Sequence, residues 1–409
     1  MNGDMLPSPS RGKLALFSFV ATLLFFAGME GIARMAFETR CGTLDRLEAW
    51  SRDQTHKTIG GTSSSLSHSV PMPYDPYLIW HLIPRFQGEN LGVHVFHNSA
   101  GLRSPEIPRH KPEGTRRILL LGDSTTYGHG VRSGFTLRDR LEQGLREALK
   151  EPRIEVINGG VPGYSSLQSL NLLKRIGIHF EPDVVVILNL WSDCIFDRFT
   201  DESVIYGEGW TKTVKKIWQS ADEALAPRSA LYCVLKTRVF KRWQQTCQGL
   251  PPLCAPPPEE APGNQTRDGV RYQNVRQPGA STPQVQHSRV SVADYTHNLE
   301  AMTRYARRHG AEVVFVNPAI EYDIGRGEGK QPTPEQFAPY RRALAETASR
   351  LRVPLVDMAE AFRAETARSA QARDRLFMDI VHPTEFGDAV MTDALLPVVE
   401  EVLNDKRKR

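Results

Sequence analysis

The chain has 409 residues, of which 40% are hydrophobic and 24% are charged, and its formal net charge is +4. This composition is ordinary for a globular protein, and the length allows one large core or two domains. The small net charge, without a basic stripe interleaved with aromatic side chains, argues against nucleic acid as a partner.

The first predicted element is an apolar helix at residues 14–37. Its core, residues 14–29, carries no charge, and two basic residues precede it, which is the layout of a signal peptide or a signal anchor. The stretch "AGMEG" offers no clean cleavage site, which favours an uncleaved transmembrane anchor over a cleaved signal. We therefore predict a cytoplasmic N-terminus at residues 1–13 and a single-pass protein held by the membrane, with its main domain extracytoplasmic, in the periplasm or at the cell surface.

Two segments separate this helix from the main domain. Residues 38–75 are polar and rich in serine, as in a linker. Residues 76–115 mix aromatic residues, prolines and glycines, which predicts an extension of short strands and turns packed on the main domain.

The main domain is predicted at residues 116–405, where apolar runs of strand length alternate with helical patterns. The strands are expected at 117–122, 153–159, 183–190, 311–318 and 353–358. The helices are expected at 136–150, 167–180, 292–309, 334–351 and 384–403. Continuous apolar strands, each followed by a helix, predict an α/β fold: a three-layer αβα sandwich, flavodoxin-like, with about five parallel strands.

Residues 201–290 interrupt this alternation and are predicted to be an insertion. One or two helices rich in Trp, Lys and Arg are expected within residues 209–245, and a proline-rich, partly disordered stretch around 250–288.

The five cysteines match no spacing of paired zinc ligands. Three of them, Cys233, Cys247 and Cys254, are close enough in sequence for one disulfide, and buried thiols are the alternative.

Polar residues follow the predicted strands at the edge where open α/β sheets place their chemistry. Ser124 follows the first strand, and it is either the cap of the next helix or a nucleophile. Asp379 lies three residues before His382 near the last helix. An Asp that orients a His, which in turn takes a proton from a Ser, is the arrangement of a serine hydrolase.

Three motifs resemble those of the SGNH or GDSL hydrolases: "GDS" at Ser124, "N-x-x-x-x-G" ending at Gly163, and "D-x-x-H-P" at Asp379 and His382. The leader "DPYLIW…NSAGLRSPE" and the N-terminal apolar segment are similar to those of membrane-anchored bacterial members. The resemblance implies Ser124 as nucleophile, His382 as base and Asp379 as its partner. It implies an oxyanion hole formed by Ser124, Gly163 and Ser192, although the family usually has Asn at the position of Ser192.

Other polar and aromatic residues at the same sheet edge are predicted to line the substrate pocket: Asp123, Thr125, Tyr127, Asn189, Trp191 and Asp193. His129, near the nucleophile in sequence, is the alternative base. No metal and no organic cofactor is expected, because the triad chemistry needs neither.

The resemblance therefore implies a serine esterase that removes O-acyl groups, with O-acetyl on a glycan as the expected substrate. Two alternatives stay open. The first is an O-acyltransferase of exopolysaccharide or cell-envelope modification, which would need a membrane partner as acyl donor. The second is a catalytically silent glycan-binding or assembly protein, suggested by Ser192.

Overall fold

The computed structural model describes residues 11–41, 70, 72, 74–75, 77–197, 200–207, 209–225, 229–235, 287–326 and 333–408. The chain forms two compact units. One combines Met1–Thr58 with Thr213–Thr266, and the other combines Ile59–Lys212 with Arg267–Arg409.

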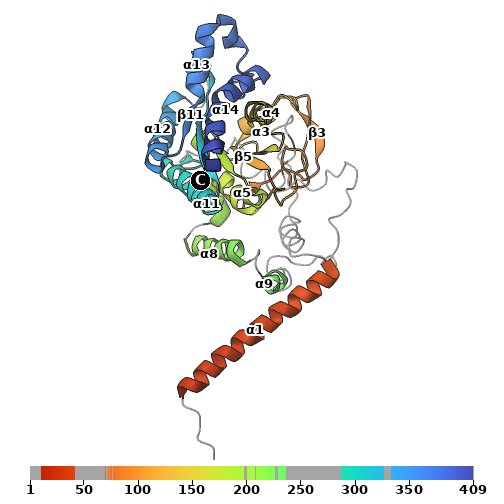
Figure 1. The fold of residues 1–409 in the computed structure, drawn as a ribbon. Helices are drawn as coiled ribbons and strands as arrows, with labels where there is room; N and C mark the ends of the chain where they lie inside the picture. The colour runs from red at the N-terminus through yellow and green to blue at the C-terminus, as the bar shows by residue number, and fades with distance from the viewer. Residues whose placement is uncertain are drawn as a thin grey trace, which may run out of the picture. The chain divides into compact units, whose positions relative to one another are not determined.

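The second unit is built on a parallel sheet of five strands (Figure 1). The strands are β5 (Arg116–Gly122), β6 (Ile154–Gly160), β7 (Val184–Ile187), β10 (Glu312–Asn317) and β11 (Leu355–Asp357). Their order across the sheet is β6-β5-β7-β10-β11, and every neighbouring pair is parallel. This is the flavodoxin-like strand order, so the predicted α/β fold with a five-stranded parallel sheet is confirmed.

Successive residues of β5 enter two different cores because side chains along a strand alternate between the faces of the sheet. Leu119 and Leu121 join one apolar cluster, and Ile118 and Leu120 join the other. The first cluster is completed by helices α5, α11 and α12, the second by α4, α13 and α14 (Figure 1). Both faces of the sheet are therefore covered, as three layers require.

These helices are α4 (Leu137–Leu149), α5 (Ser166–Arg175), α11 (Val292–Arg308), α12 (Pro334–Leu351), α13 (Met358–Arg368) and α14 (Glu385–Lys408). Hydroxyl side chains start three of them: Thr136 caps α4, Ser165 caps α5 and Ser291 caps α11. The short helices are α3 (Ser124–Tyr127), α6 (Trp191–Cys194), η1 (Gly177–Phe180), η4 (Glu321–Ile324) and η5 (Ala370–Asp374). Helix α13 was not predicted from the sequence, and it follows β11 without a loop.

The extension before β5 consists of two antiparallel strand pairs and turns. Strand β1 (Tyr74–Asp75) pairs with β2 (Ile79–Trp80), and β3 (Gln87–Asn90) pairs with β4 (Val93–Phe96). Leu78, Val95 and Leu102 belong to the same buried cluster as α5 and α11. The extension thus contributes short strands and buried side chains to the core of this unit.

The insertion begins and ends in a short antiparallel pair, β8 (Phe196–Asp197) with β9 (His287–Ser288). Within it lie α7 (Asp201–Tyr206), α8 (Gly209–Leu225) and α9 (Ala230–Leu235), which agrees with the helices expected within residues 209–245. The stretch predicted to be partly disordered, residues 250–288, lies outside the described residues except for its last two.

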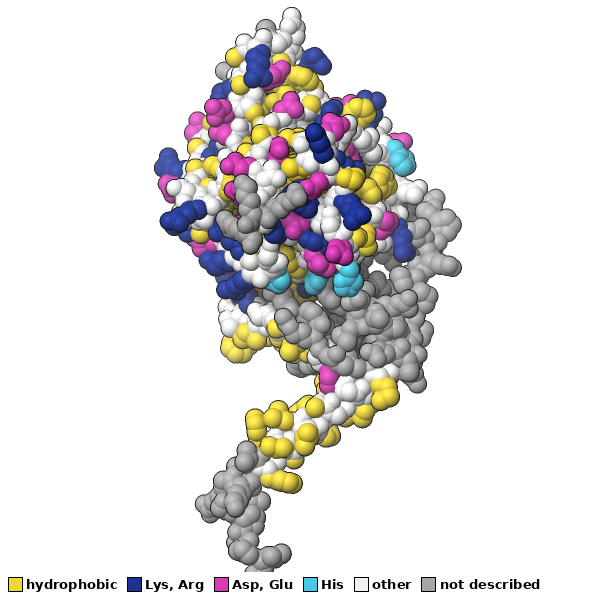
Figure 2. Space-filling view, in the orientation of Figure 1, with side chains coloured by type: hydrophobic (Ala, Val, Ile, Leu, Met, Phe, Trp, Pro, Cys, Tyr) yellow, Lys and Arg dark blue, Asp and Glu magenta, His cyan; other side chains and the backbone are white. Residues whose placement is uncertain are grey.

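Helix α1 (Arg11–Cys41) carries the N-terminal apolar segment, and apolar side chains such as Phe17 and Leu24 are exposed. Figure 2 shows hydrophobic side chains along this helix. Glu30 of this helix accepts hydrogen bonds from Ser229 and from the Leu231 N–H at the start of α9. Across the residues that the structure describes, we find no helix with the length and hydropathy of a membrane span. The helix is thus confirmed, whereas its prediction as a transmembrane helix is not.

Candidate active site

Ser124 is the first residue of α3, directly after strand β5. Asp123 is the N-cap of this helix, because its carboxylate accepts a hydrogen bond from the Thr125 N–H. The sequence left open whether Ser124 is itself the cap, and that reading is wrong. The turn is tight: a Cβ on Gly122 would lie 2.1 Å from the Thr126 hydroxyl oxygen, so only glycine fits there. Ser124 is half-buried, and its hydroxyl takes no part in this cap.

Ser124, His382 and Asp379 form one hydrogen-bonded chain. The Nε2 atom of His382 lies 2.8 Å from Ser124 Oγ, and its Nδ1 lies 2.6 Å from Asp379 Oδ2. The other Asp379 oxygen accepts from the N–H groups of Val381 and His382, which fixes the carboxylate in its loop. With Nδ1–H donating to Asp379, Nε2 is the acceptor of the Ser124 proton, which is the tautomer that a general base requires.

The electrostatics of the Asp379 carboxylate suit this arrangement. Burial acts to raise its pKa, but hydrogen bonds and the charge of His382 outweigh burial and bring the pKa down to about 2. The carboxylate is therefore ionised at any physiological pH. The fixed negative charge of Asp379, beside Nδ1, stabilises the imidazolium that forms when His382 takes a proton. The Asp379 side chain is 51% exposed, which places the triad at the surface.

The loop that carries Gly163 supplies the candidate oxyanion hole. It follows β6, and its Val161 N–H donates to the carbonyl of Gly122, next to the nucleophile turn. Gly163 has a φ of +77°, a conformation that favours glycine. Within the described chain, neither the Ser124 nor the Gly163 N–H donates to another protein group. Both are therefore available to an oxyanion.

Ser192, the third predicted member of this hole, is engaged elsewhere. Its hydroxyl donates to Asp123 Oδ2 at 3.2 Å, and the side chain is buried. Burial raises the pKa of Asp123, and the Ser192 hydroxyl is among the groups that counteract this shift. The structure thus brings Ser192 close to the nucleophile turn, with its proton directed at Asp123.

The six predicted pocket residues fall into three groups. Tyr127, Asn189 and Asp193 are fully buried, which does not fit a role in lining a substrate pocket. Each is hydrogen-bonded to a protein group: Tyr127 to the His97 ring, Asn189 to the Tyr164 carbonyl, and Asp193 to Ser166. Asp123 and Thr125 are buried beside the nucleophile, and only Trp191 is partly exposed.

The buried Asp193 carboxylate is surrounded by protein groups that hydrogen-bond to it. It accepts from both the N–H and the hydroxyl of Ser166 at the start of α5, and burial raises its pKa to about 7. It therefore joins the α6 turn to α5 rather than facing a ligand.

Two residues of the extension, Arg103 and His97, support the turn after Ser124, and neither was predicted as a site residue from the sequence. The buried Arg103 guanidinium donates to the carbonyls of Tyr127, Gly128 and Val131. His97 Nδ1–H donates to the Ile83 carbonyl, so Nε2 accepts from the Tyr127 hydroxyl. Burial lowers the pKa of His97 to about 4, in agreement with a neutral ring. Their only sequence signal was the polar "HNSAGLR" stretch.

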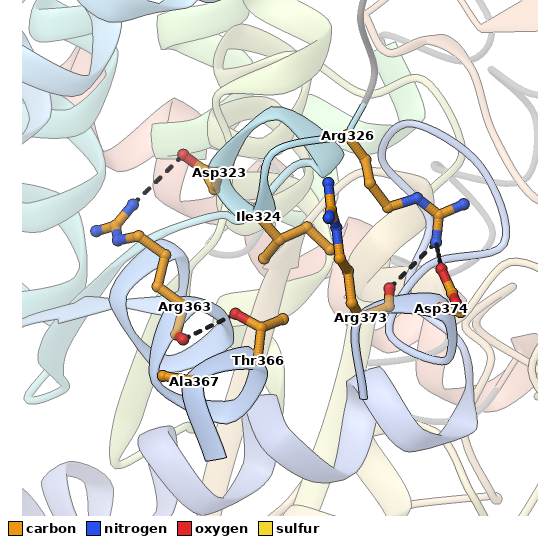
Figure 3. A pocket seen from close by; sticks show the side chains of 8 residues that line it. All are labelled: Asp323, Ile324, Arg326, Arg363, Thr366, Ala367, Arg373 and Asp374. Carbon is orange, nitrogen blue, oxygen red and sulfur yellow. Dashed lines mark hydrogen bonds and ion pairs between the residues drawn. The ribbon is translucent and has the colours of Figure 1, made fainter. Parts of the chain in front are cut away.

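Figure 3 shows a cavity of this unit, whose volume is about 790 Å³. It is lined by Asp323, Ile324, Arg326, Arg363, Thr366, Ala367, Arg373 and Asp374. Its arginines are engaged with nearby groups: Arg326 with Asp374, and Arg363 with Asp323 (Figure 3). None of the triad residues lines this cavity, so it is distinct from the candidate active site. In the described part of the chain, no cluster of His, Cys, Asp or Glu side chains is arranged to hold a metal ion.

Comparison with known proteins places this geometry in a family. The model of the GDSL-like lipase/acylhydrolase family matches residues 120–390. Among solved structures, a lipase/acylhydrolase from Enterococcus faecalis is 15% identical, with 70% of this chain and 96% of that chain covered and a TM-score of 0.39. An acetyl xylan esterase is 14% identical, with coverages of 69% and 99% and a TM-score of 0.39. A catalytic mutant of an acetylxylan esterase from Geobacillus stearothermophilus is 15% identical, with coverages of 70% and 95% and a TM-score of 0.40.

No curated protein matches the sequence significantly. The family match spans more than half of the chain and includes Ser124, Asp379 and His382. The chain belongs to the GDSL-like lipase/acylhydrolase family, and it is an ester-acting hydrolase by that membership.

Proposed function

We propose that the protein is a serine esterase that removes small O-acyl groups, with O-acetyl groups of a glycan as substrate. The hydrogen-bonded chain from Ser124 through His382 to Asp379 is the observation that carries this proposal. Ser124 attacks the ester carbonyl while His382 takes its proton. His382 then returns that proton to the departing alcohol, and water repeats the sequence to release the acid.

The surface position of the triad is consistent with a polymeric substrate. The Asp379 side chain is half-exposed and Ser124 is accessible, so an acyl group on a bulky glycan can reach the nucleophile without the glycan entering the protein. The free Ser124 and Gly163 N–H groups are the donors for the developing oxyanion.

Hydrolysis of p-nitrophenyl acetate by the full-length chain, compared with Ser124→Ala, tests the esterase. The expected result is turnover by the parent and none above background by the variant. Release of acetate from an O-acetylated polysaccharide then tests the glycan. Equal rates for the parent and Ser124→Ala would remove Ser124 from the mechanism, and polysaccharide binding without turnover would favour the silent binding protein.

We propose in addition that α1 associates with a membrane and holds the α/β unit outside the cytoplasm. The support is the uncharged stretch at residues 14–29 and the exposure of Phe17, which is 73% accessible. Membrane fractions washed with alkaline carbonate should retain the full-length chain and should release a variant that lacks residues 1–37. Release of the full-length chain and of the variant alike by the wash would contradict the proposal.

A further inference from the structure

The peptide group between Pro162 and Gly163 is held on its carbonyl side by a side chain from outside the α/β core. The indole Nε1–H of Trp80 donates to the Pro162 carbonyl at 3.0 Å. Trp80 ends strand β2 of the extension, 82 residues before Pro162. The N–H of this same peptide is the Gly163 donor of the candidate oxyanion hole.

Trp80 is itself firmly placed. It is 7% exposed, and its own carbonyl accepts from the Tyr164 hydroxyl at 2.6 Å. Two residues earlier, the Leu78 carbonyl accepts from the Gln168 amide, also at 2.6 Å. The indole packs on the glycine, because a Cβ on Gly163 would lie 3.1 Å from the ring. The extension is thus bonded both to this loop and to helix α5.

A second long-range contact fixes the next carbonyl of the loop. The Nη1 atom of Arg289, which follows β9 at the end of the insertion, donates to the Gly163 carbonyl at 2.7 Å. Its guanidinium also makes two bonds to Asp201 and one to Gln168, and it lies 5.3 Å from the Trp80 ring centroid. The carbonyls of Pro162 and Gly163 therefore both accept hydrogen bonds from distant side chains. These two bonds leave the Pro162–Gly163 peptide group little freedom to rotate.

We propose that Trp80 is a positioning residue of the oxyanion hole, an inference that rests on the proposed esterase function. The C=O and N–H of a planar trans peptide point in opposite directions, so a donor that fixes the Pro162 carbonyl also fixes the direction of the Gly163 N–H. A hydrogen bond to the carbonyl also polarises the peptide and strengthens its N–H as a donor. Such preorganisation lowers the barrier because the donor does not have to reorient when negative charge forms on the substrate.

Trp80→Phe tests this role, since it keeps an aromatic ring and removes the N–H. Outright loss of one oxyanion donor costs about 100- to 1,000-fold in kcat. A donor that is still present but no longer held should cost less, about 10-fold, with KM changed by less than about 2-fold. The matched control is Asn171→Ala, which removes a 2.8 Å bond from α5 to the Tyr77 carbonyl and leaves the Pro162–Gly163 peptide untouched. Asn171→Ala should keep the parental kcat.

A spectroscopic measurement reads the peptide directly, without turnover. Labelling with carbonyl-13C proline and 15N glycine gives signals only from Pro–Gly pairs, of which the sequence has three, ending at Gly163, Gly263 and Gly279. Pro162→Ala identifies the first signal by removing it. Trp80→Phe should shift this signal in both dimensions and leave the other two in place, whereas Asn171→Ala should shift none. If Trp80→Phe does not fold, 3-benzothienylalanine at position 80 removes the N–H at constant shape.

The outcomes separate the two proposals. A shifted signal in a protein without Ser124-dependent turnover would overturn the esterase and leave the placement of the peptide by Trp80 standing. If the parent turns over the ester and Trp80→Phe has the same kcat as the parent, or leaves the Pro162–Gly163 signal unmoved, the positioning role alone is overturned. An equal loss of kcat in Asn171→Ala would also overturn it, because any loosening of the extension would then suffice.

Discussion

The imidazole of His129 packs against the imidazole of His382, with ring centroids 4.7 Å apart. The amide nitrogen of Asn90 lies 3.0 Å from His129 Nδ1. Because an amide nitrogen can only donate, Nδ1 is the acceptor of this hydrogen bond and carries no proton. Burial, reinforced by the neighbouring His382, lowers the pKa of His129 to about 4. His129 is thus a neutral ring that supports His382, and only His382 is hydrogen-bonded to Ser124.

This relationship decides between the two candidate bases. We expect His382→Gln to lower kcat/KM by about 1,000-fold or more, because general-base catalysis is worth about 100- to 10,000-fold and the nucleophile is inactive without it. His129→Gln should cost less than about 10-fold, since it loses packing and no proton-transfer role. Rates of p-nitrophenyl acetate hydrolysis for both variants check this. The reverse order of losses would make His129 the base.

The low pKa of Asp379, about 2, determines what the pH dependence of activity reports. Because Asp379 stays ionised well below neutrality, the contribution of its carboxylate to kcat/KM should be constant between pH 5 and pH 8. Asp379→Asn should lower kcat/KM by up to about 10,000-fold across this whole range, through loss of the correct tautomer. Hydrolysis of p-nitrophenyl acetate by parent and variant at each pH measures the ratio. A ratio that falls towards one as pH drops from 8 to 5 would mean that Asp379 becomes protonated within this range.

The direction of the Ser192 hydroxyl leads to a third prediction. Since this hydroxyl donates to Asp123, its removal should not empty the oxyanion hole. We expect Ser192→Ala to keep kcat within about 10-fold of the parent, well short of the 100- to 1,000-fold expected for a lost donor. Steady-state kinetics at saturating ester measure the difference. A loss of 100-fold or more, with normal thermal stability, would return Ser192 to the hole.

A fourth prediction concerns stability and the buried carboxyl of Asp388 on α14. One of its oxygens accepts from the Leu137 N–H at 2.9 Å, and burial raises its pKa to about 8. An unfolded aspartate has a pKa of about 3.9, so between pH 4 and 8 the folded state holds a proton that the unfolded state lacks. The contribution of Asp388 to stability therefore decreases as pH rises through this range.

Asp388→Asn removes this titration and keeps an acceptor for Leu137. The melting temperature of the variant relative to the parent should increase steadily from pH 5 to pH 8, as measured by circular dichroism. Asp393→Asn, at an exposed position of the same helix, is the control and should show a constant difference. A constant difference for Asp388→Asn as well would mean that Asp388 is already ionised at pH 5.

The five strands could be predicted because each is apolar on both faces, a pattern that buried parallel strands share. The pairing of Asp379 with His382 could also be predicted, because they lie three positions apart in one loop. Other features depend on distant partners. Trp80 and Arg289 contact residues 82 and 126 positions away, and the Ser192 hydroxyl is directed by Asp123, 69 positions away. No local pattern encodes such contacts. The burial of Tyr127 and Asn189 was missed for the same reason, since a polar residue after a strand faces a pocket or the interior depending on the elements packed over it.

The pairing of β8 with β9 brings residues Asp197 and His287 side by side. The entropy of closing a loop grows only with the logarithm of its length, about 0.6 kcal/mol for each doubling. A chain that leaves and re-enters a domain through one short antiparallel ladder can therefore gain or lose many residues there at small cost to the fold. Changes in the length of the chain between β8 and β9 should therefore cost the fold little, provided that Arg289, directly after the ladder, and its partner Asp201 are kept.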